Sequence, residues 1–313
     1  MSLHLTPLPA ARFDEWRAAS RQRLIDGNRR SGRRPGADAV GHVEHTFDEL
    51  FPEGVATSTA WVASIVDAAD GELGTLLLAL NGQKLVLLDL VFETTSTDAQ
   101  RDDLLHGILQ IARDRGATQI AMPLFPQDTA ARAFVEGRGF EVASIQMVLE
   151  PLPVREVAGH VDVRPMTAER FPRFVAASEE GFAHDLAESG RYTPEEAAAE
   201  SHRQMLAELP DGLDTEGQEL FTATVAGTEV GILWFGMRRR DGRPQAFILD
   251  IEVAAKQRRK GYGRELMHAA ERAARRLGAE SIGLHVFGFN EGAVELYEQL
   301  GYRRTEESLL RDL

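Results

Sequence analysis

The stretch QRRKGYGREL, residues 257–266, places a cluster of cations and two glycines at the start of an amphipathic helix. The first backbone N–H groups of a helix have no partner within it, and they lie at the positive end of the helix dipole. Such a helix start binds anions, and glycines at 261 and 263 let a phosphate approach the backbone without a Cβ in between. We therefore expect a phosphate or pyrophosphate site here. A tight strand-to-helix turn with incidental arginines gives the same pattern and remains an alternative.

Two common phosphate-binding motifs do not fit this stretch. A P-loop needs Gly-Lys-Ser/Thr after its spacer, and no such triplet is present. A dinucleotide-binding fingerprint needs a third glycine, but position 266 is Leu, and the motif lies late in its domain rather than in a first strand–helix–strand unit. These motifs therefore do not identify the anion, and the surrounding sequence has to do so.

The composition limits the other classes of function. The 313 residues include 35 Lys and Arg against 49 Asp and Glu, a formal net charge of −14, and no cysteine. The acidic balance argues against a nucleic-acid binder, and the absence of cysteine excludes disulfides, thiolate metal sites and a cysteine nucleophile. No apolar run approaches the roughly 20 residues of a membrane helix, and the start shows no secretory pattern. We expect a cytoplasmic protein without a membrane, nucleic-acid or metal partner.

The chain contains an internal repeat. RPMTAERFPRFVAAS (164–178) matches TPLPAARFDEWRAAS (6–20) at an offset of 158 residues, and LMHAAERAARRLGAESIGLHVF (266–287) matches LLHGILQIARDRGATQIAMPLF (104–125) at an offset of 162. Two nearly constant offsets indicate tandem copies of one fold. We place the copies at 1–150 and 161–313, and we interpret the proline-containing stretch 151–160 as an extended linker.

Each copy shows the same order of expected elements: a strand, helices, two or three strands, a long helix, a buried strand, a short helix and a last strand. In the second copy the long helix spans about 262–277 and ends at Gly278 as a left-handed cap. Strands interspersed with helices and a hairpin predict a mixed α/β sheet. The basic stretch 26–41, DGNRRSGRRPGADAVG, is expected to be a mobile loop with solvated arginines.

The motif of the opening stretch has a partner downstream. The pattern R-x-x-G-x-G at 258–263 is followed by a strand ending at Asn290 and by the helix NEGAVELYEQLGY, which contains Tyr297. This ordered pair of motifs closely resembles the GNAT superfamily of acetyl-CoA-dependent N-acyltransferases, over about 161–308. Together with its repeat, the chain resembles a tandem GNAT protein. The resemblance implies an α/β fold of two GNAT-like domains, each a mixed, mostly antiparallel twisted sheet flanked by helices.

The resemblance assigns roles to residues of this sequence. It implies that the backbone amides of the turn cradle the CoA pyrophosphate, that the strand before it pairs with the pantetheine, and that the next strand, GLHVFGF, splays away to admit the thioester. Asn290 would contact the pantetheine arm, or serve only as a helix cap. Tyr297 would be the general acid for the leaving thiolate, or only a core residue. The residues expected to hold acetyl-CoA are Ile251, Val253, Arg258, Arg259, Lys260, Gly261, Tyr262, Gly263, Arg264 and Asn290.

Within this resemblance, a base must deprotonate the acceptor amine. Asp250 and Glu252 alternate with apolar residues and so share one face of their strand. Both are catalytic candidates, with Glu252 nearer the thioester, although a solvent-facing strand gives the same pattern. His285 is a weaker candidate. Side chains of the first helix would either wall the acceptor site or face solvent, namely Glu179, Glu180, His184 and Asp185.

The first copy lacks the groups that the resemblance makes functional. At the offset of 162 residues the two turn glycines become Ala99 and Arg101, the asparagine becomes Asp128, and the tyrosine becomes Val135. Aspartates at 98, 102 and 103 would repel a pyrophosphate there, whereas the packing residues remain apolar. We therefore expect a degenerate copy that is structural, or that helps to shape the acceptor site, and that does not catalyse.

The leading hypothesis is acetyl transfer from acetyl-CoA, as co-substrate, to the amine of a small molecule. Since no cysteine is present to carry the acyl group, direct attack in a ternary complex is favoured. We expect a monomer or a homodimer. Two alternatives remain: an acetyltransferase acting on peptides or proteins, and a CoA-binding regulatory module without turnover.

Overall fold

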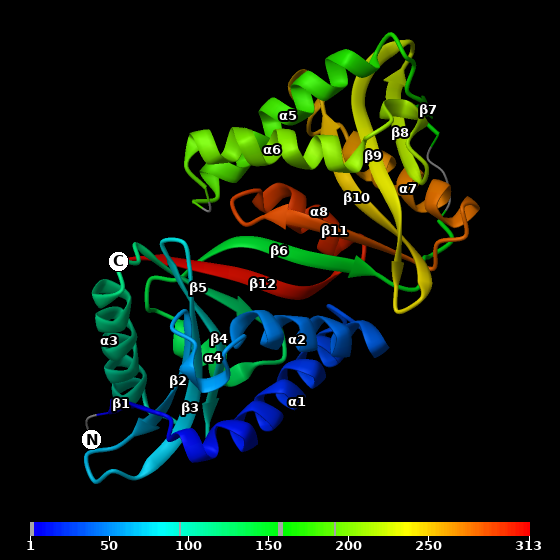
Figure 1. The fold of residues 1–313 in the computed structure, drawn as a ribbon. Helices are drawn as coiled ribbons and strands as arrows, with labels where there is room; N and C mark the ends of the chain where they lie inside the picture. The colour runs from blue at the N-terminus through cyan, green and yellow to red at the C-terminus, as the bar shows by residue number, and fades with distance from the viewer. Residues whose placement is uncertain (1–2, 94, 156–158, 191) are drawn as a thin grey trace. The chain divides into compact units, whose positions relative to one another are not determined.

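The computed structural model describes residues 3–93, 95–155, 159–190 and 192–313, and it shows the same element order twice (Figure 1). The first copy contains β1 (His4–Pro7), α1 (Phe13–Ser31), α2 (Gly36–Leu50), β2 (Ala60–Val66), β3 (Glu72–Asn81), β4 (Lys84–Phe92), α3 (Asp98–Asp114), β5 (Gln119–Leu124), α4 (Thr129–Val135) and β6 (Glu141–Leu149). The second contains β7 (Asp162–Pro165), α5 (Phe171–Glu188), α6 (Pro194–Glu208), β8 (Gln218–Val225), β9 (Thr228–Arg240), β10 (Arg243–Val253), α7 (Tyr262–Arg276), β11 (Ser281–Phe287), α8 (Glu291–Gln299) and β12 (Arg303–Asp312). The predicted duplication and α/β class are therefore confirmed.

The chain forms two compact units, and the two units exchange their last strands. One unit comprises residues 1–142 with 305–313, and the other comprises residues 143–304. In the first unit β12 pairs antiparallel with β5, and in the second unit β6 pairs antiparallel with β11. The units thus differ from the contiguous copies expected at 1–150 and 161–313, because the last strand of each copy completes the sheet of the other unit.

Each unit has a mixed sheet in which antiparallel pairs dominate. The strand order is β1-β2-β3-β4-β5-β12 in the first unit and β6-β11-β10-β9-β8-β7 in the second. Neighbours within each unit pair antiparallel except β4 with β5 and β10 with β11, which pair parallel. A parallel pair needs a crossover connection, and here α3 and α7 provide it. This agrees with the mixed, mostly antiparallel sheet expected from the sequence.

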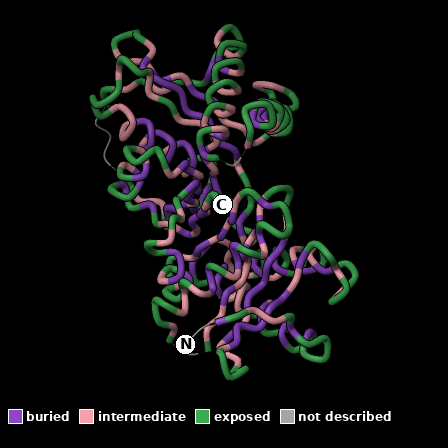
Figure 2. Tube along the Cα trace, turned by 90° about the vertical axis from the view of Figure 1, so that its left-hand side faces the viewer, coloured by how far each residue is buried: buried purple, intermediate pink, exposed green. Residues whose placement is uncertain are grey.

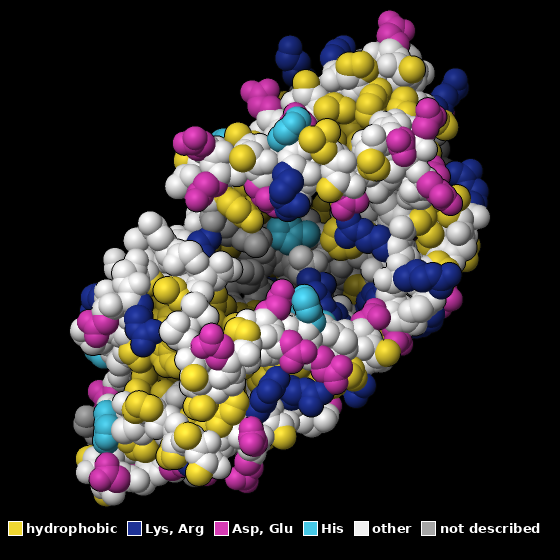
Figure 3. Space-filling model, in the orientation of Figure 1, with side chains coloured by type: hydrophobic (Ala, Val, Ile, Leu, Met, Phe, Trp, Pro, Cys, Tyr) yellow, Lys and Arg dark blue, Asp and Glu magenta, His cyan; other side chains and the backbone are white. Residues whose placement is uncertain are grey.

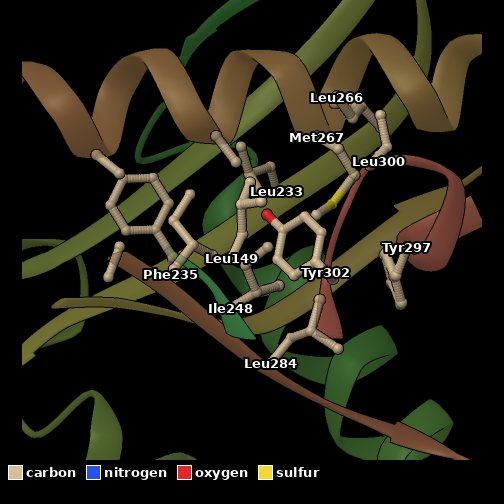
Figure 4. Packing of buried hydrophobic residues seen from close by; sticks show 14 of the residues in the cluster. Leu149, Leu233, Phe235, Ile248, Leu266, Met267, Leu284, Tyr297, Leu300 and Tyr302 are labelled. Carbon is tan, nitrogen blue, oxygen red and sulfur yellow. The ribbon is translucent and has the colours of Figure 1, made fainter. Parts of the chain in front are cut away.

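The second unit buries apolar side chains on both faces of its sheet. One core lies beneath α7 and α8, where Leu266, Met267 and Ala270 of α7 meet Ile248 and Leu284 of the sheet (Figure 4). A second core lies between the opposite face and the helices α5 and α6. Strands are largely buried and loops largely exposed in Figure 2. The sheet is therefore a rigid layer on which side chains at the end of β10 can be held in fixed positions.

The segment before β7 is anchored on α7. Of the expected linker 151–160, residues 156–158 lie outside the described residues. Arg155 donates from Nε to Oε2 of Glu271 at 2.6 Å, and the Glu271 side chain is almost completely buried. A buried carboxylate is tolerated when it is paired. This ion pair therefore fastens the linker to the helix that begins at the glycine turn.

The expectation of a mobile loop at 26–41 is wrong. These residues form the last turn of α1, a short corner and the start of α2. Gly32 adopts a left-handed conformation (φ 71°) that ends α1, and the amide of Arg34 donates to the carbonyl of Asn28. Arg33 and Arg34 are partly buried rather than fully solvated. The composition suggested a loop because Gly and Pro that end one helix and precede the next also occur in loops.

Among the described residues, no helix is both long enough and apolar enough to cross a membrane. On the face shown in Figure 3, Lys and Arg side chains are interspersed with Asp and Glu. The formal charge of −14 is therefore not gathered into one acidic area of this face.

Candidate active site

The start of α7 is an open anion-binding position. Gly261 precedes the helix in a left-handed conformation (φ 85°), and no side chain caps the helix start. The amides of Arg264 and Glu265 donate to the Gly261 carbonyl. Within the described part of the chain, the amides of Tyr262 and Gly263 have no hydrogen-bond acceptor. Two free donors at the positive end of a helix dipole can bind a phosphate.

The side chains of the turn add positive charge around these amides. Arg258, Arg259 and Lys260 are all exposed. The Nε of Arg258 donates to the Val253 carbonyl at 3.0 Å, which ties the turn to the end of β10. Lys260 donates from Nζ to Gln257 at 2.8 Å. The cationic turn is therefore held close to the strand that precedes it.

Arg264 and Gly263 connect the start of α7 to α8. The guanidinium of Arg264 donates to Oε1 of Gln299 at 2.6 Å. A Cβ at Gly263 would lie 3.3 Å from Cδ2 of Leu296, which is tight packing. Gly263 therefore serves the close approach of α7 and α8, in addition to leaving its amide free.

β10 and β11 part at the level of the site. Their parallel pairing covers Gln245–Ile248 with Ser281–Leu284 and ends there. Beyond that point β10 continues along β9 to Val253, while β11 continues along β6 to Phe287. The backbone of β10 beyond Ile248 is therefore not paired with β11. The expected splaying of these two strands is confirmed.

A β-bulge in β10 decides which side chains face which way. Leu249 is the extra residue, because Ile248 lies opposite Phe235 whereas Asp250 lies opposite Trp234. Bulges bend a strand and redirect the side chains that follow. After the bulge, Ile251 and Val253 pack against the core beneath α7 and α8. Asp250 points to the other face, where it meets α5.

Asp250 is the carboxylate with the most altered acidity at the site. Ser178 of α5 donates from Oγ to its Oδ2 at 2.6 Å. Burial, together with the nearby charges of Glu252 and Asp185, raises the pKa of Asp250 to about 6, although the Ser178 hydrogen bond acts in the opposite direction. No Lys, Arg or His in the described ranges forms an ion pair with Asp250. Glu252 is less buried than Asp250 and has a cationic partner. Its side chain is 57% exposed, and its Oε1 lies 3.7 Å from Nη2 of Arg258.

Tyr297 of α8 is buried beneath the start of α7, with its ring 5.9 Å from that of Tyr302 (Figure 4). Burial and the charge of Asp250 raise the pKa of Tyr297 to about 12. The phenol is therefore neutral at ordinary pH and retains a proton that it can donate. Asn290 precedes α8 as its cap and accepts from the amide of Ala293 at 3.3 Å.

The other candidates of the acceptor side separate into surface and partly buried groups. Glu179 pairs with His202 at 3.0 Å, and His184 pairs with Glu188 at 3.4 Å, both at exposed positions. Asp185 is partly buried, and burial raises its pKa. Of these residues, Asp185 is therefore the one that acts electrostatically on the site.

His285 and Glu180 have different surroundings. The ring of His285 packs edge-on against Phe287 at 5.1 Å on β11, and Glu180 is exposed on α5. Sequence reasoning did not identify Ser178. The signal for it was present, because Ser178 ends the repeated stretch that aligns it with Ser20.

In the first unit the equivalent helix start carries a side-chain cap and an ion-paired aspartate. Thr97 caps α3. Its Oγ1 accepts a hydrogen bond from the amide of Gln100, and Oε1 of Gln100 accepts one from the amide of Thr97. Arg101 and Arg138 both donate to Asp98. Asp98 is thus ion-paired rather than bare, so the expected repulsion by free aspartates needs correction. The capping box occupies the amides of Thr97 and Gln100, so this helix start differs from that of α7, which has no side-chain cap within the described residues.

The second unit thus combines an open helix start beside two parting strands with a partly buried carboxylate and a buried phenol. The model of the Acetyltransferase (GNAT) family matches residues 183–302. The uncharacterized N-acetyltransferase YycN of Bacillus subtilis is 31% identical over 150 residues, which cover 48% of this chain and 96% of that protein. The chain belongs to the GNAT family of acetyltransferases.

Two further proteins are similar to this chain, one in sequence and one in fold. A mycothiol acetyltransferase of Propionibacterium freudenreichii is 35% identical over 130 residues, which cover 42% of this chain and 39% of that protein. The crystal structure of a GCN5-related N-acetyltransferase from Sphaerobacter thermophilus matches 98% of this chain and 94% of its own, with a TM-score of 0.53 and 15% identity. This second likeness concerns the fold alone. The chain thus contains two copies of one fold, and the family model matches residues of the second copy.

Proposed function

We propose that the second unit transfers an acetyl group from acetyl-CoA to the amine of a small molecule. The observation that carries this proposal is the position of Asp250, a partly buried carboxylate beyond the point where β10 and β11 part. Acetyl-CoA is the acetyl donor that membership of the GNAT family implies. When bound, it supplies the acetyl group as an activated thioester.

The residues of the second unit fit such a co-substrate. The left-handed Gly261 and the free amides after it leave room and donors for a pyrophosphate. The cations of the turn are Arg258, Arg259, Lys260 and Arg264. We assign the pyrophosphate to this turn from Arg258 to Arg264, with Tyr262 and Gly263 donating their amides. We assign the pantetheine to the unpaired edge of Ile251 and Val253, with Asn290 beside it.

We assign the proton transfers to two side chains. Asp250, with a pKa of about 6, is mostly ionised at pH 7 to 8 and still basic enough to accept a proton from an ammonium group. Tyr297, with a pKa of about 12, holds its proton and is the donor for the departing sulfur. Glu252 is more exposed and paired with Arg258. We therefore place it at the rim of the site as a second acid rather than as the base.

We propose that the first unit does not catalyse. Its helix start carries the Thr97 capping box, and Ala99 and Arg101 stand where the second unit has its two turn glycines. Val135 ends α4 where Tyr297 lies in α8, so the unit has no phenol at that position. These differences support a structural role for the first unit, or a role in shaping the acceptor site.

The test is release of free CoA thiol from acetyl-CoA over a panel of amines. The panel should include aliphatic amines, peptide amino-termini and the acceptor of the mycothiol acetyltransferases, since two relatives carry that name. We expect turnover with a small amine, and a loss of about 10²-fold or more in Asp250→Asn and in Tyr297→Phe. Turnover only with peptides would replace the small-molecule acceptor. A failure to bind acetyl-CoA would refute the proposal.

A further inference from the structure

The corner between α1 and α2 of the first unit (Figure 1) brings together cations that the proposed function does not use. Arg33 and Arg34 stand in this corner, and His42 lies further along α2. The amide of Arg34 donates to the Asn28 carbonyl at 3.3 Å, and the amide of Arg33 donates to Oγ of Ser31 at 3.1 Å. The corner therefore presents two adjacent arginines from a backbone that is held in place.

The two guanidinium groups have few partners in the chain. Within the described ranges, the side chain of Arg34 forms no hydrogen bond and no ion pair. The Nε of Arg33 is buried without a hydrogen-bond partner there, since Oε1 of Glu306 lies 3.6 Å away, which is too long for a hydrogen bond. A partly buried polar group without a partner is unfavourable. Burial and the charge of Arg33 accordingly lower the pKa of Arg34.

The carboxylates near this pair do not balance its charge. Glu306 of β12, which belongs to the first unit, pairs with Arg33, and Asp38 of α2 acts on Arg34 in the same sense. Partial burial and the charges of Arg34 and Arg33 nevertheless lower the pKa of His42 to about 4. Nearby positive charge lowers the pKa of an imidazole. The local potential is therefore positive, although the chain as a whole has a formal net charge of −14.

The second unit has the same corner with different side chains. Gly190 adopts a left-handed conformation (φ 70°), as Gly32 does (φ 71°). The counterpart of Arg33 is Arg191, which lies outside the described residues. At the offset of 158 residues, other cationic positions become neutral or acidic: Arg30 becomes Glu188, Arg34 becomes Tyr192 and His42 becomes Glu200. The packing of two helices at this corner therefore does not require Arg34 and His42.

We propose that Arg33, Arg34 and His42 bind a phosphate group in the first unit. Guanidinium groups donate two parallel hydrogen bonds to phosphate oxygens, and a neutral imidazole donates one N–H. A phosphate dianion has enough oxygens and enough charge for two adjacent arginines, whereas a carboxylate carries a single charge. The proposal does not depend on acetyl transfer by the second unit. It gives the first unit, which we do not expect to catalyse, a ligand of its own.

The test is a calorimetric titration of the full chain with inorganic phosphate. We expect a Kd of about 1 mM or lower for the wild type, and binding weaker by about tenfold or more in Arg34→Gln. Arg30→Gln is the matched control, because it removes the same charge from an exposed residue whose Nε donates to the Asp26 carbonyl. It should stay within about threefold of the wild type. Glu306→Gln should bind about threefold more tightly or better, since it removes a competing carboxylate.

Three outcomes of these titrations would overturn the proposal. They are no binding by the wild type at about 10 mM phosphate, equal losses in Arg34→Gln and Arg30→Gln, and acetate binding as tight as that of phosphate. Methyl phosphate distinguishes the sources of the phosphate group. Equal or tighter binding of methyl phosphate assigns the site to a phosphate ester, and weaker binding assigns it to inorganic phosphate.

Stability and the ionisation of His42 provide readouts that a merely structural role would not move. Without phosphate, Arg34→Gln should unfold at the wild-type Tm or above, because the Arg34 side chain has no partner to lose among the described residues. Phosphate should raise the Tm of the wild type and not that of the variant. The charged groups that act on His42 are Arg33, Arg34 and His45. In NMR titrations, phosphate should raise the pKa of His42 to about 5 or higher. A lower Tm of Arg34→Gln without phosphate, or an unchanged pKa of His42, would contradict the proposal.

Discussion

Asp250→Asn should stabilise the second unit while it removes activity. The pKa of Asp250 is raised from 3.8 to about 6 in the folded chain, so the ionised carboxylate is disfavoured there relative to the unfolded chain. A carboxyl group whose pKa is raised in the folded chain stabilises the fold in its protonated form. This stability is fully present below pH 3.8 and is lost as the pH rises through about 6. The difference of about two pH units corresponds to about 3 kcal/mol at roughly 1.4 kcal/mol each. Since Asn cannot ionise, the variant keeps this stability above pH 6.

The assay is urea denaturation of wild type and variant at pH 4 and pH 8, followed by tryptophan fluorescence. Trp234 reports on the second unit and faces Asp250 across β9 and β10. We expect the variant to be more stable by about 2–3 kcal/mol at pH 8 and by much less at pH 4. Asp89→Asn is the matched control, because it leaves the Arg23 guanidinium without its carboxylate and should destabilise the first unit. Equal signs for the two variants at pH 8 would refute the reasoning.

Three further predictions follow from the same site. Tyr297→Phe should lower turnover by about 10²-fold without changing the Kd of acetyl-CoA. Its control, Tyr302→Phe, should leave turnover unchanged in the same assay, because the buried Tyr302 hydroxyl has no hydrogen-bond partner among the residues that the structure describes. Gly261→Ala and Gly278→Ala each place a side chain at a left-handed residue bordering α7. Each should lower the free energy of unfolding by roughly 1–2 kcal/mol. Calorimetry should show weaker acetyl-CoA binding for Gly261→Ala alone, and equal weakening in both would contradict the anion site. The profile of kcat/KM against pH should rise to a plateau with a midpoint near pH 6 as Asp250 ionises, and a flat profile would exclude Asp250 as the base.

The repeat and the helix-start motif could be predicted because both are local patterns. The offsets of 158 and 162 residues predicted two copies with the same element order, and the structure confirms that order. Gly261 and the free helix start after it follow from a cationic, glycine-containing turn before an amphipathic helix. Such features depend on neighbouring residues alone, and a single sequence contains them.

The features that were not predicted depend on partners far apart in the chain. The bulge at Leu249 exists only through the register of β10 with β9. The bond from Ser178 to Asp250 spans 72 residues. The exchange of β6 and β12 could not be predicted from the sequence either. The pattern of buried and exposed residues along a strand indicates which side chains face the core, but it does not indicate whether the strand pairs with β5 or with β11.

The central claim is that one of the two copies, the second, binds acetyl-CoA. The most direct measurement is an isothermal calorimetric titration of the full chain with acetyl-CoA, read for the number of sites. The account predicts one site per chain, because the turn before α7 has the left-handed Gly261 and a cluster of cations, whereas the start of α3 has the Thr97 cap followed by Asp98. Two sites per chain, or none, would contradict it.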